Sequence, residues 1–467
     1  MTVASHQPRE AAAARSRAGL IALAALGCLC ILGSLLLTAG VAAFLRGQPA
    51  LSAEGAHKLA ALRLAGLAFG LVLLLVCIAL ARMRGGVLLG LGLLVGFAAA
   101  AQRVYVTEMY PGNLMARGTG PGRLWSVFTG ADLALGEYAP RSTLMVEEHH
   151  VARPRFPVIN AHAHFGRQEI TPAAVLAIMD SSGVEIAINL DGQDSADIAR
   201  YAREYGRRVI TFRHLWFPRG RVDSQFFSTL IRKTEEASRA GARGLKIWKH
   251  LGLRTLDSDG RLIRVDDPRL DPLWERAAAL KLTVMLHLAD PEPFFQPMDR
   301  FNERYEEMVV HPEVHYKADG LPTRSEILAQ FERVVAKHPQ TTFIGAHMLW
   351  SANDLAALGG LLDRHPNLYV ETSAGLPELG RTPSTARRFF IRYQNRILFG
   401  TDGNHRYIGT RNYAVHYRFF ETEDEYFDYP FVELTDAGRW KIYGIALPDS
   451  VLRKVYRENA ARVIDIR

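Results

Sequence analysis

Phe156-Pro-Val-Ile-Asn-Ala-His162-Ala-His164-Phe-Gly166 is a short apolar run that ends in His-x-His. In a β-strand, residues two apart point to the same face, so His162 and His164 would project together from the C-terminal end of a strand. Gly166 follows directly and lets the backbone turn. Two imidazoles side by side make half of a metal site. For this motif alone, the alternative is two unrelated polar residues at the start of a loop.

Three more apolar runs of strand length end in a residue that can bind a metal. They are Leu282-Thr-Val-Met-Leu-His287, Thr342-Phe-Ile-Gly-Ala-His347 and Arg396-Ile-Leu-Phe-Gly-Thr-Asp402. A single buried histidine is more often a satisfied core residue than a ligand, but three such endings after a His-x-His are hard to assign to chance. In a barrel of parallel strands, these side chains would converge on the face where such enzymes build their sites.

The composition of the first hundred residues differs sharply from that of the rest. Residues 18–45 are almost wholly apolar, carry no charge and are long enough to span a bilayer. Residues 64–81 and 85–101 are two further candidates. A signal peptide is the alternative for the first segment, although its apolar stretch is too long and no clear cleavage site follows. A hairpin of buried soluble helices is the alternative for the other two. The sequence predicts a membrane region over 1–104 with three transmembrane helices.

Nearly all of the net charge of +8 belongs to this N-terminal region. Before Tyr105 there are nine basic and two acidic residues, which leaves 47 basic and 46 acidic residues in the rest of the chain. A protein that binds nucleic acid would show a clustered basic face, and these totals give no support for one. We therefore expect no nucleic-acid partner.

The basic residues that flank the predicted spans favour a cytoplasmic N-terminus. Five lie on one side of a three-span arrangement: Arg9, Arg15, Arg17, Arg82 and Arg84. Four lie on the other side: Arg46, Lys58, Arg63 and Arg103. By the positive-inside rule, three spans then place the large domain outside the cytoplasm. The three cysteines (Cys28, Cys30 and Cys77) all lie in the apolar segments, which fits an oxidising compartment without requiring one. We expect a multi-pass membrane protein with an extracytoplasmic, periplasmic-side catalytic domain.

Residues 105–155 are rich in glycine and proline and are predicted to form a connector. After them, strand-like and helix-like runs alternate. Besides the four runs quoted above, the strand-like runs are 184–190, 209–216, 244–248 and 368–371. The helix-like runs include 172–181, 223–240, 270–280, 324–337 and 354–364. Eight alternating units predict a parallel sheet, and their combined length suits a (β/α)₈ TIM-like barrel over 156–467.

The complete set of strand endings resembles that of the amidohydrolase superfamily. Its pattern is His-x-His on the first strand, His on the fifth and sixth, and Asp on the eighth. Further matches are Gly244-Leu-Lys246-Ile, Gly400-Thr-Asp402 and Val455-Tyr-Arg-Glu-Asn459-Ala-Ala-Arg462. The chain is similar to the second large branch (amidohydrolase family 2), which includes aminocarboxymuconate-semialdehyde decarboxylase and pyrone-dicarboxylate lactonase. The resemblance covers 156–467, about two-thirds of the chain, and leaves out the membrane region.

The resemblance implies that His162, His164, His287 and Asp402 hold a divalent metal ion. Neutral imidazoles with one carboxylate suit zinc best, and also manganese, iron or cobalt. An open coordination position would lower the pKa of a water and polarise a substrate carbonyl. His347 would orient or deprotonate the water, or protonate the substrate, and Asp402 would also accept a proton.

Lys246 on the fourth strand has three interpretations. It binds an anionic group of the substrate, it is carboxylated and bridges two metals as in binuclear members of the superfamily, or it reaches out of the barrel mouth to solvent. We favour substrate binding, because a barrel-facing lysine needs a partner. On a continuous strand, Trp248 and His250 share its face and would also contact substrate.

Three classes of function follow. The first is a membrane-anchored, metal-dependent hydrolase that cleaves an amide, lactone or ester-like bond in a small molecule with an anionic group. The second is non-oxidative decarboxylation of an unsaturated or aromatic acid by the same site. The third is a non-catalytic membrane receptor or scaffold. The complete ligand set argues against the third class, because loss of catalysis would more typically leave gaps in it.

Overall fold

The computed structural model describes residues 142–165, 171–317, 320–403, 410–429 and 437–466. The chain divides into two units, Met1–Pro140 and Arg141–Arg467, and the described residues all belong to the second. The predicted spans at 18–45, 64–81 and 85–101 lie outside the described residues. Within the ranges described, no helix combines the length and apolar character needed to cross a bilayer.

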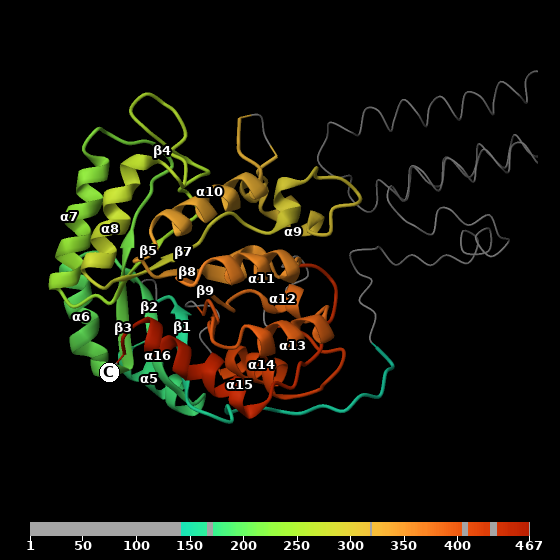
Figure 1. Cartoon of the computed structure of the whole chain (residues 1–467). Helices are drawn as coiled ribbons and strands as arrows, with labels where there is room; N and C mark the ends of the chain where they lie inside the picture. The colour runs from blue at the N-terminus through green and yellow to red at the C-terminus, as the bar shows by residue number, and fades with distance from the viewer. Residues whose placement is uncertain (1–141, 166–170, 318–319, 404–409, 430–436, 467) are drawn as a thin grey trace, which may run out of the picture. The chain divides into compact units, whose positions relative to one another are not determined.

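Eight parallel strands form one sheet at the centre of this unit (Figure 1). In sheet order they are β1 (Val158–Ala163), β2 (Val184–Gly192), β3 (Val209–Leu215), β5 (Gly244–Ile247), β7 (Thr283–Leu286), β8 (Phe343–Gly345), β9 (Leu368–Glu371) and β10 (Ile397–Leu398). The first and last strands meet: the Ala161 N–H donates to the Phe399 carbonyl at 2.8 Å, and the His164 N–H to the Gly403 carbonyl at 2.9 Å. The predicted (β/α)₈ barrel is therefore confirmed, with a strand in each of the eight predicted runs.

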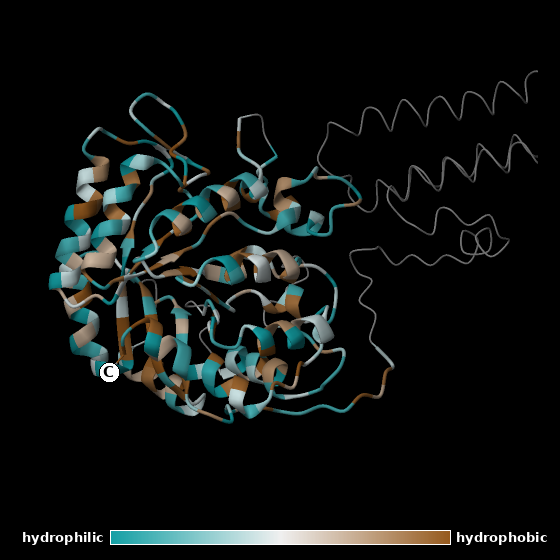
Figure 2. Cartoon of the chain, in the orientation of Figure 1, coloured by the Kyte–Doolittle hydropathy of each residue, from teal (hydrophilic) through white to brown (hydrophobic). Residues whose placement is uncertain are grey.

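Helices surround the barrel, and all five predicted helical runs are present. The longer helices are α5 (Pro172–Ser181), α6 (Ser195–Tyr205), α7 (Phe226–Arg239), α8 (Asp271–Ala279), α10 (Arg324–Lys337), α11 (Leu355–Arg364), α13 (Pro383–Arg392) and α14 (Thr410–Glu421). The shorter ones are α9 (Tyr305–Val310), α12 (Leu376–Leu379), α15 (Asp449–Arg453) and α16 (Asn459–Val463). In Figure 2, α6, α7 and α8 show hydrophilic residues interleaved with apolar ones, as expected for helices with one face against the sheet. Side-chain caps from Thr171 and Thr323 set the starts of α5 and α10.

A small apolar core fills the inside of the barrel. It includes Ile159, Ile188, Met285 and Ile344 from the strands, together with Ala460 and Ile464 from the C-terminal segment. The Asn459 side-chain amide donates to the Ile397 carbonyl at 2.7 Å and fastens α16 to the last strand. A second, larger core lies between the strands and the surrounding helices.

Two features beyond the barrel were not predicted. A second sheet pairs two short parallel strands, β4 (Gly220–Arg221) and β6 (Thr255–Leu256). The end of the predicted connector is attached to the barrel unit, because the His149 N–H donates to the Asp424 carboxylate at 2.7 Å and Arg155 pairs with Asp449 at 2.7 Å.

Candidate metal centre

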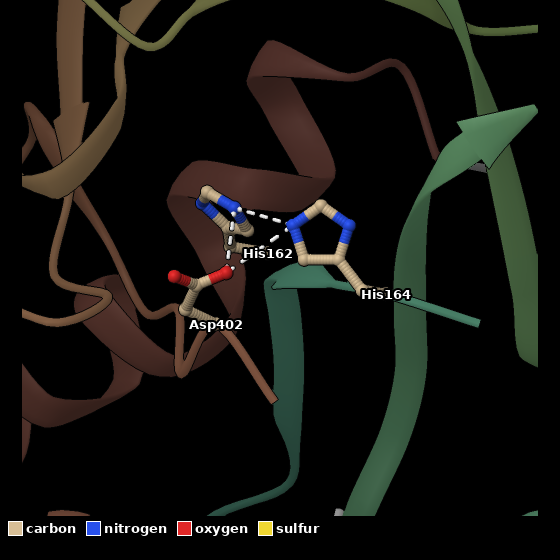
Figure 3. Close-up of side chains that lie close together, drawn as sticks. All are labelled: His162, His164 and Asp402. Carbon is tan, nitrogen blue, oxygen red and sulfur yellow. Dashed lines mark hydrogen bonds and ion pairs between the residues drawn. The ribbon is translucent and has the colours of Figure 1, made fainter. Parts of the chain in front are cut away.

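Three of the predicted ligands meet at the C-terminal end of the barrel (Figure 3). The Nε2 atoms of His162 and His164 lie 3.2 Å apart, and each lies 3.2 Å from Oδ1 of Asp402. In a tetrahedral zinc site with bonds of about 2.0–2.1 Å, ligand atoms are about 3.3 Å apart. We call these three ligand atoms, His162 Nε2, His164 Nε2 and Asp402 Oδ1, the triangle. Their spacing and chemistry suit three of the four ligands of such a cation.

The outer nitrogen of each histidine is bonded to a carboxylate. His162 Nδ1 lies 2.8 Å from Glu371, and His164 Nδ1 lies 2.8 Å from Asp191. Because an ionised carboxylate can only accept a hydrogen bond, the Nδ1 atom of each ring must carry the proton. The Nε2 lone pair of each ring is then left facing the triangle. Carboxylates in this position orient a metal-binding imidazole and make it a stronger ligand.

Asn160 connects the two segments that carry the ligands, the end of β1 and the segment after β10. Its side-chain oxygen accepts the backbone N–H groups of His162 at 3.1 Å and Thr401 at 3.2 Å. Its amide donates to Thr401 Oγ1 and the Tyr413 hydroxyl at 2.9 and 3.0 Å. Asp402 follows with φ at +53°, a left-handed conformation that Asp tolerates better than most residues. Buried and fully bonded, Asn160 fixes where both ligand-bearing segments leave the barrel.

The charges at the triangle favour a cation. Burial raises the pKa of Asp402, but the attraction of His162 and its hydrogen bonds hold that pKa well below its usual range. Burial lowers the pKa of His164, yet hydrogen bonds to Asp191 and Asp402 raise it to about 9. The carboxylates of Asp191 and Asp402 thus stabilise a positive charge at this position. That charge is either a proton on His164 or a bound metal ion that replaces the proton.

Glu371, at the end of β9, binds several parts of the site at once. Oε1 accepts the His347 N–H at 2.8 Å in addition to bonding His162, and both oxygens are bonded to Ser373. Burial raises the pKa of Glu371, while the neighbouring His162 lowers it to about 2. His162, His347 and Glu371 form a second group with closely spaced ligand atoms. Since these atoms are buried and already bonded to each other or to Ser373, the triangle is the better metal site.

Replacing Glu371 by glutamine is expected to weaken metal binding by about 10–100-fold. The neutral amide would replace the negatively charged carboxylate that accepts the hydrogen bond from His162 Nδ1. Competition with a chelator of known affinity would measure this. Glu332→Gln is the matched control, since Glu332 also bonds a histidine (His365 Nε2, 3.0 Å) but lies on α10. Equal affinities for Glu371→Gln and the parent protein would show that Glu371 does not support the ligand.

His287 lies in the same opening but not in the triangle. Its Nδ1 is 3.1 Å from His347 Nε2, and its Nε2 accepts from the Trp350 indole N–H at 3.3 Å. Burial lowers the pKa of His287 to about 4, so the ring is neutral at neutral pH. The structure thus brings three of the four predicted ligands together, and the role of His287 as the fourth ligand stays a prediction.

His347 lies on an unusual turn directly after β8 (Phe343–Gly345). His347, Met348, Leu349 and Trp350 all have positive φ, between 51° and 56°. A left-handed conformation costs a non-glycine residue about 1–2 kcal/mol. The ring of Trp350 then stacks on that of His347, with centroids 4.6 Å apart. Burial holds the pKa of His347 well below its usual value, so this ring is also neutral.

Arg324, at the start of α10, supports this turn. Its Nη2 donates to the carbonyls of Leu349 and Trp350 at 3.0 and 2.6 Å, and to Ser351 Oγ at 2.7 Å. The guanidinium is buried. It therefore supplies donors to carbonyl groups that the left-handed backbone cannot pair within itself.

Arg324→Ala is expected to destabilise the barrel by about 2–4 kcal/mol, because it leaves buried carbonyl groups without a donor. Urea denaturation followed by circular dichroism would measure the change. Arg333→Ala, on the same helix but with a half-exposed side chain paired to Asp266, should cost no more than about 1 kcal/mol. If both substitutions cost the same, Arg324 does not support the turn.

Lys246 faces the triangle from β5. Its Nζ lies 3.3 Å from His162 Nε2, and among the described residues it forms no ion pair with a carboxylate. Burial lowers the pKa of Lys246 to about 8. A cavity of about 1080 Å³ opens here, lined by the triangle, Lys246, His287 and Trp248 among others. Its size suits a small-molecule ligand.

The predicted grouping of Lys246, Trp248 and His250 on one face of a strand is wrong for His250. The strand ends at Ile247, and the chain turns through Lys249 and His250. His250 is buried beneath Trp248 rather than among the residues that line the cavity: its Nδ1 bonds the Phe217 carbonyl at 2.8 Å. Alternation of side chains holds only while the chain stays extended.

Five groups of the site were missed by sequence analysis. They are Asp191, His214, Trp216, Trp350 and Glu371. Asp191, His214 and Glu371 end strands that were predicted, so their position beside the ligands could have been noticed. Trp216 ends the same predicted run as His214, at 209–216, whereas Trp350 lies in a turn that has no sequence signature.

The chain was also compared with known proteins. Residues 159–466 match the family model described as amidohydrolase. No curated protein matches the chain. Among solved structures, 2,6-dihydroxybenzoate decarboxylase from Rhizobium is 17% identical over 67% of this chain and 99% of its own, with a TM-score of 0.41. The 5-carboxyvanillate decarboxylase from Sphingomonas paucimobilis is 14% identical over 67% and 100%, with a TM-score of 0.40. The 4-oxalomesaconate hydratase from Rhodopseudomonas palustris is 11% identical over 66% and 96%, with a TM-score of 0.41.

Likenesses at these values do not distinguish one reaction from another. The match to the family model does identify the family, because it extends over the barrel from β1 (Val158–Ala163) to the C-terminal segment. By this match, the chain belongs to the amidohydrolase family.

Proposed function

We propose that this chain is a metal-dependent hydrolase that cleaves an amide, lactone or ester-like bond in a small molecule with an anionic group. The observation that carries the proposal is the triangle of His162, His164 and Asp402, with its Nε2 lone pairs directed inward and its Nδ1 atoms bonded to carboxylates. Two imidazoles and one carboxylate fit zinc, and they also accept manganese, iron or cobalt.

A divalent metal bound there would lower the pKa of a water and polarise the carbonyl to be attacked. Asp402, held as a carboxylate, would accept the proton of that water. His347, neutral and 3.1 Å from His287, would orient the water or pass a proton to the leaving group. Lys246 would bind the anionic group of the substrate and hold its scissile bond toward the triangle.

Non-oxidative decarboxylation is the second candidate, and Lys246 is the observation that favours it. A buried ammonium without a carboxylate partner among the described residues would bind a substrate carboxylate equally well. In that reaction the carbon–carbon bond to the carboxylate breaks, carbon dioxide leaves, and a proton takes its place. His347 or Asp402 would deliver that proton.

Isotopes separate the two reactions. The full-length protein, purified without chelators and with its metal content measured, would be given panels of lactones, esters, amides and unsaturated acids in H₂¹⁸O. Incorporation of ¹⁸O into a carboxylate product is the expected result. Release of carbon dioxide without ¹⁸O would replace hydrolysis by decarboxylation. A protein that binds no zinc or manganese and turns over nothing would support a receptor or scaffold instead.

We also propose that the N-terminal region anchors the barrel in a membrane and that the barrel lies on the extracytoplasmic side. The support is the apolar composition of 18–45, 64–81 and 85–101 and the excess of arginine at one set of flanks. Because the barrel contains no cysteine, Asp259→Cys at an exposed position gives a single reporter there. Labelling by an impermeant maleimide in intact spheroplasts is expected. Labelling only after lysis would reverse the orientation.

A further inference from the structure

Two tryptophans form a stacked pair at the mouth of the cavity. Trp216 follows β3 and Trp248 follows β5, and both line the cavity that contains the metal triangle. Their ring centroids are 5.8 Å apart, with planes inclined by 29°. Trp216 is 47% exposed. An indole this exposed at a cavity leaves a flat apolar surface open to a ligand.

His250 contacts both tryptophans of the pair. The centroid of the His250 ring lies 5.7 Å from that of Trp216, in an edge-to-face arrangement, and 4.6 Å from that of Trp248. His250 is itself fixed by the Phe217 carbonyl and by the Arg219 Nε–H, which donates to Nε2 at 3.3 Å. A fixed aromatic surface loses little conformational entropy when a ligand stacks on it. His250 therefore supports the two tryptophans, which explains why it lies under them and not along the cavity.

Polar groups lie beside the pair. His214 lies near the end of β3, two residues before Trp216, and the centroids of the two rings are 5.5 Å apart in an edge-to-face arrangement. Its Nε2 is buried and has no hydrogen-bond partner among the described residues. In the strand register His214 lies opposite Lys246, whose ammonium also lacks a carboxylate partner in the same ranges. Buried polar groups without partners are rare, and in a cavity they indicate where a ligand or water binds.

We propose that Trp216 and Trp248 form a stacking subsite for a flat conjugated ring of the substrate, with His214 bonding a hydroxyl or carbonyl on that ring and Lys246 its anionic group. This inference rests on the proposed function for the position of the reacting bond, which lies toward the triangle. It adds that the molecule is planar and conjugated rather than a saturated acid. The cavity, at about 1080 Å³, has room for such a ring in addition to the reacting group.

Two anions of similar size and equal charge test the stacking. Benzoate and cyclohexanecarboxylate would be titrated by calorimetry into the metal-loaded full-length protein. Because aromatic pairing adds to simple burial, benzoate is expected to bind on the order of tenfold more tightly. In Trp216→Leu that ratio should fall to about one, and in Trp216→Phe most of it should remain. An unchanged ratio in Trp216→Leu, or no preference in the parent protein, would overturn the proposal.

The control is Phe301→Leu, at a side chain that is 75% exposed and does not line the cavity. It should leave the ratio unchanged. For His214, the gain in affinity from benzoate to the best of the three hydroxybenzoates should be lost in His214→Leu. No such gain in the parent protein would remove His214 from the subsite.

This experiment separates the inference from the proposed function. Binding ratios need no turnover, so a protein that prefers benzoate through Trp216 but hydrolyses nothing would keep the stacking subsite and lose the hydrolase assignment. A protein that hydrolyses saturated lactones and shows no benzoate preference would keep the hydrolase and lose the subsite.

Discussion

Asp402→Ala is expected to lose bound metal and turnover together, and His162→Ala should do the same. Each substitution removes one corner of the triangle, and two remaining donors hold a cation far more weakly than three. Without the cation, water is not activated at neutral pH, so we expect activity to fall by about 10³-fold or more. Plasma emission spectroscopy of the purified variants, together with the rate against the best substrate, would measure both quantities.

The control for these variants is Asp259→Ala, because Asp259 is an exposed carboxylate in a surface turn of the same unit. It should keep both metal and rate. Circular dichroism spectra would show whether each variant is folded. A folded Asp402→Ala protein that retains its metal at full occupancy would remove Asp402 from the ligand set, whatever happens to the rate.

His347→Asn is expected to keep most of its metal and to lose turnover by about 10²–10⁴-fold, the usual contribution of a general acid or base. His347 is not a corner of the triangle, so its removal leaves the three donors in place. Asparagine suits the left-handed backbone at this position better than alanine, which keeps the turn intact. His347→Ala is the second variant, since it removes every polar atom of the side chain.

The measurements are metal content and single-turnover rate for both His347 variants. A rate near that of the parent protein would show that His347 has no role in proton transfer. Loss of metal together with rate in a folded variant would instead make His347 part of the metal site, through its bond to His287 Nδ1.

Most of the fold followed from short apolar runs and the residues that end them. The strands at Val184–Gly192 and Leu368–Glu371 were found because β-branched and apolar residues stop at a turn signal. The predicted ends of α5 and α10 are those of the structure, in which Thr171 and Thr323 cap the two helices. The paired strands at Gly220–Arg221 and Thr255–Leu256 were missed, because two residues carry no periodicity.

The site was predicted where it depends on strand ends and missed where it depends on loops. His162, His164 and Asp402 meet because the ends of β1 and β10 are neighbours in a closed barrel. The direction of His250 could not be predicted, since it depends on where the strand stops. The left-handed turn at His347 was equally hidden, because Arg324 supports it from a different helix and none of its four residues is glycine.

The seam between the first and last strands has a kinetic consequence. Asn160 and Thr401, which bond across it, are 241 residues apart in the sequence. Bringing such distant segments together carries a large loop-closure cost, so we expect these contacts to form late in folding. Interactions absent from the folding transition state mainly slow unfolding. A cation held by His162 and Asp402 would lie across this seam, so it should lengthen the lifetime of the folded barrel while leaving its rate of formation almost unchanged.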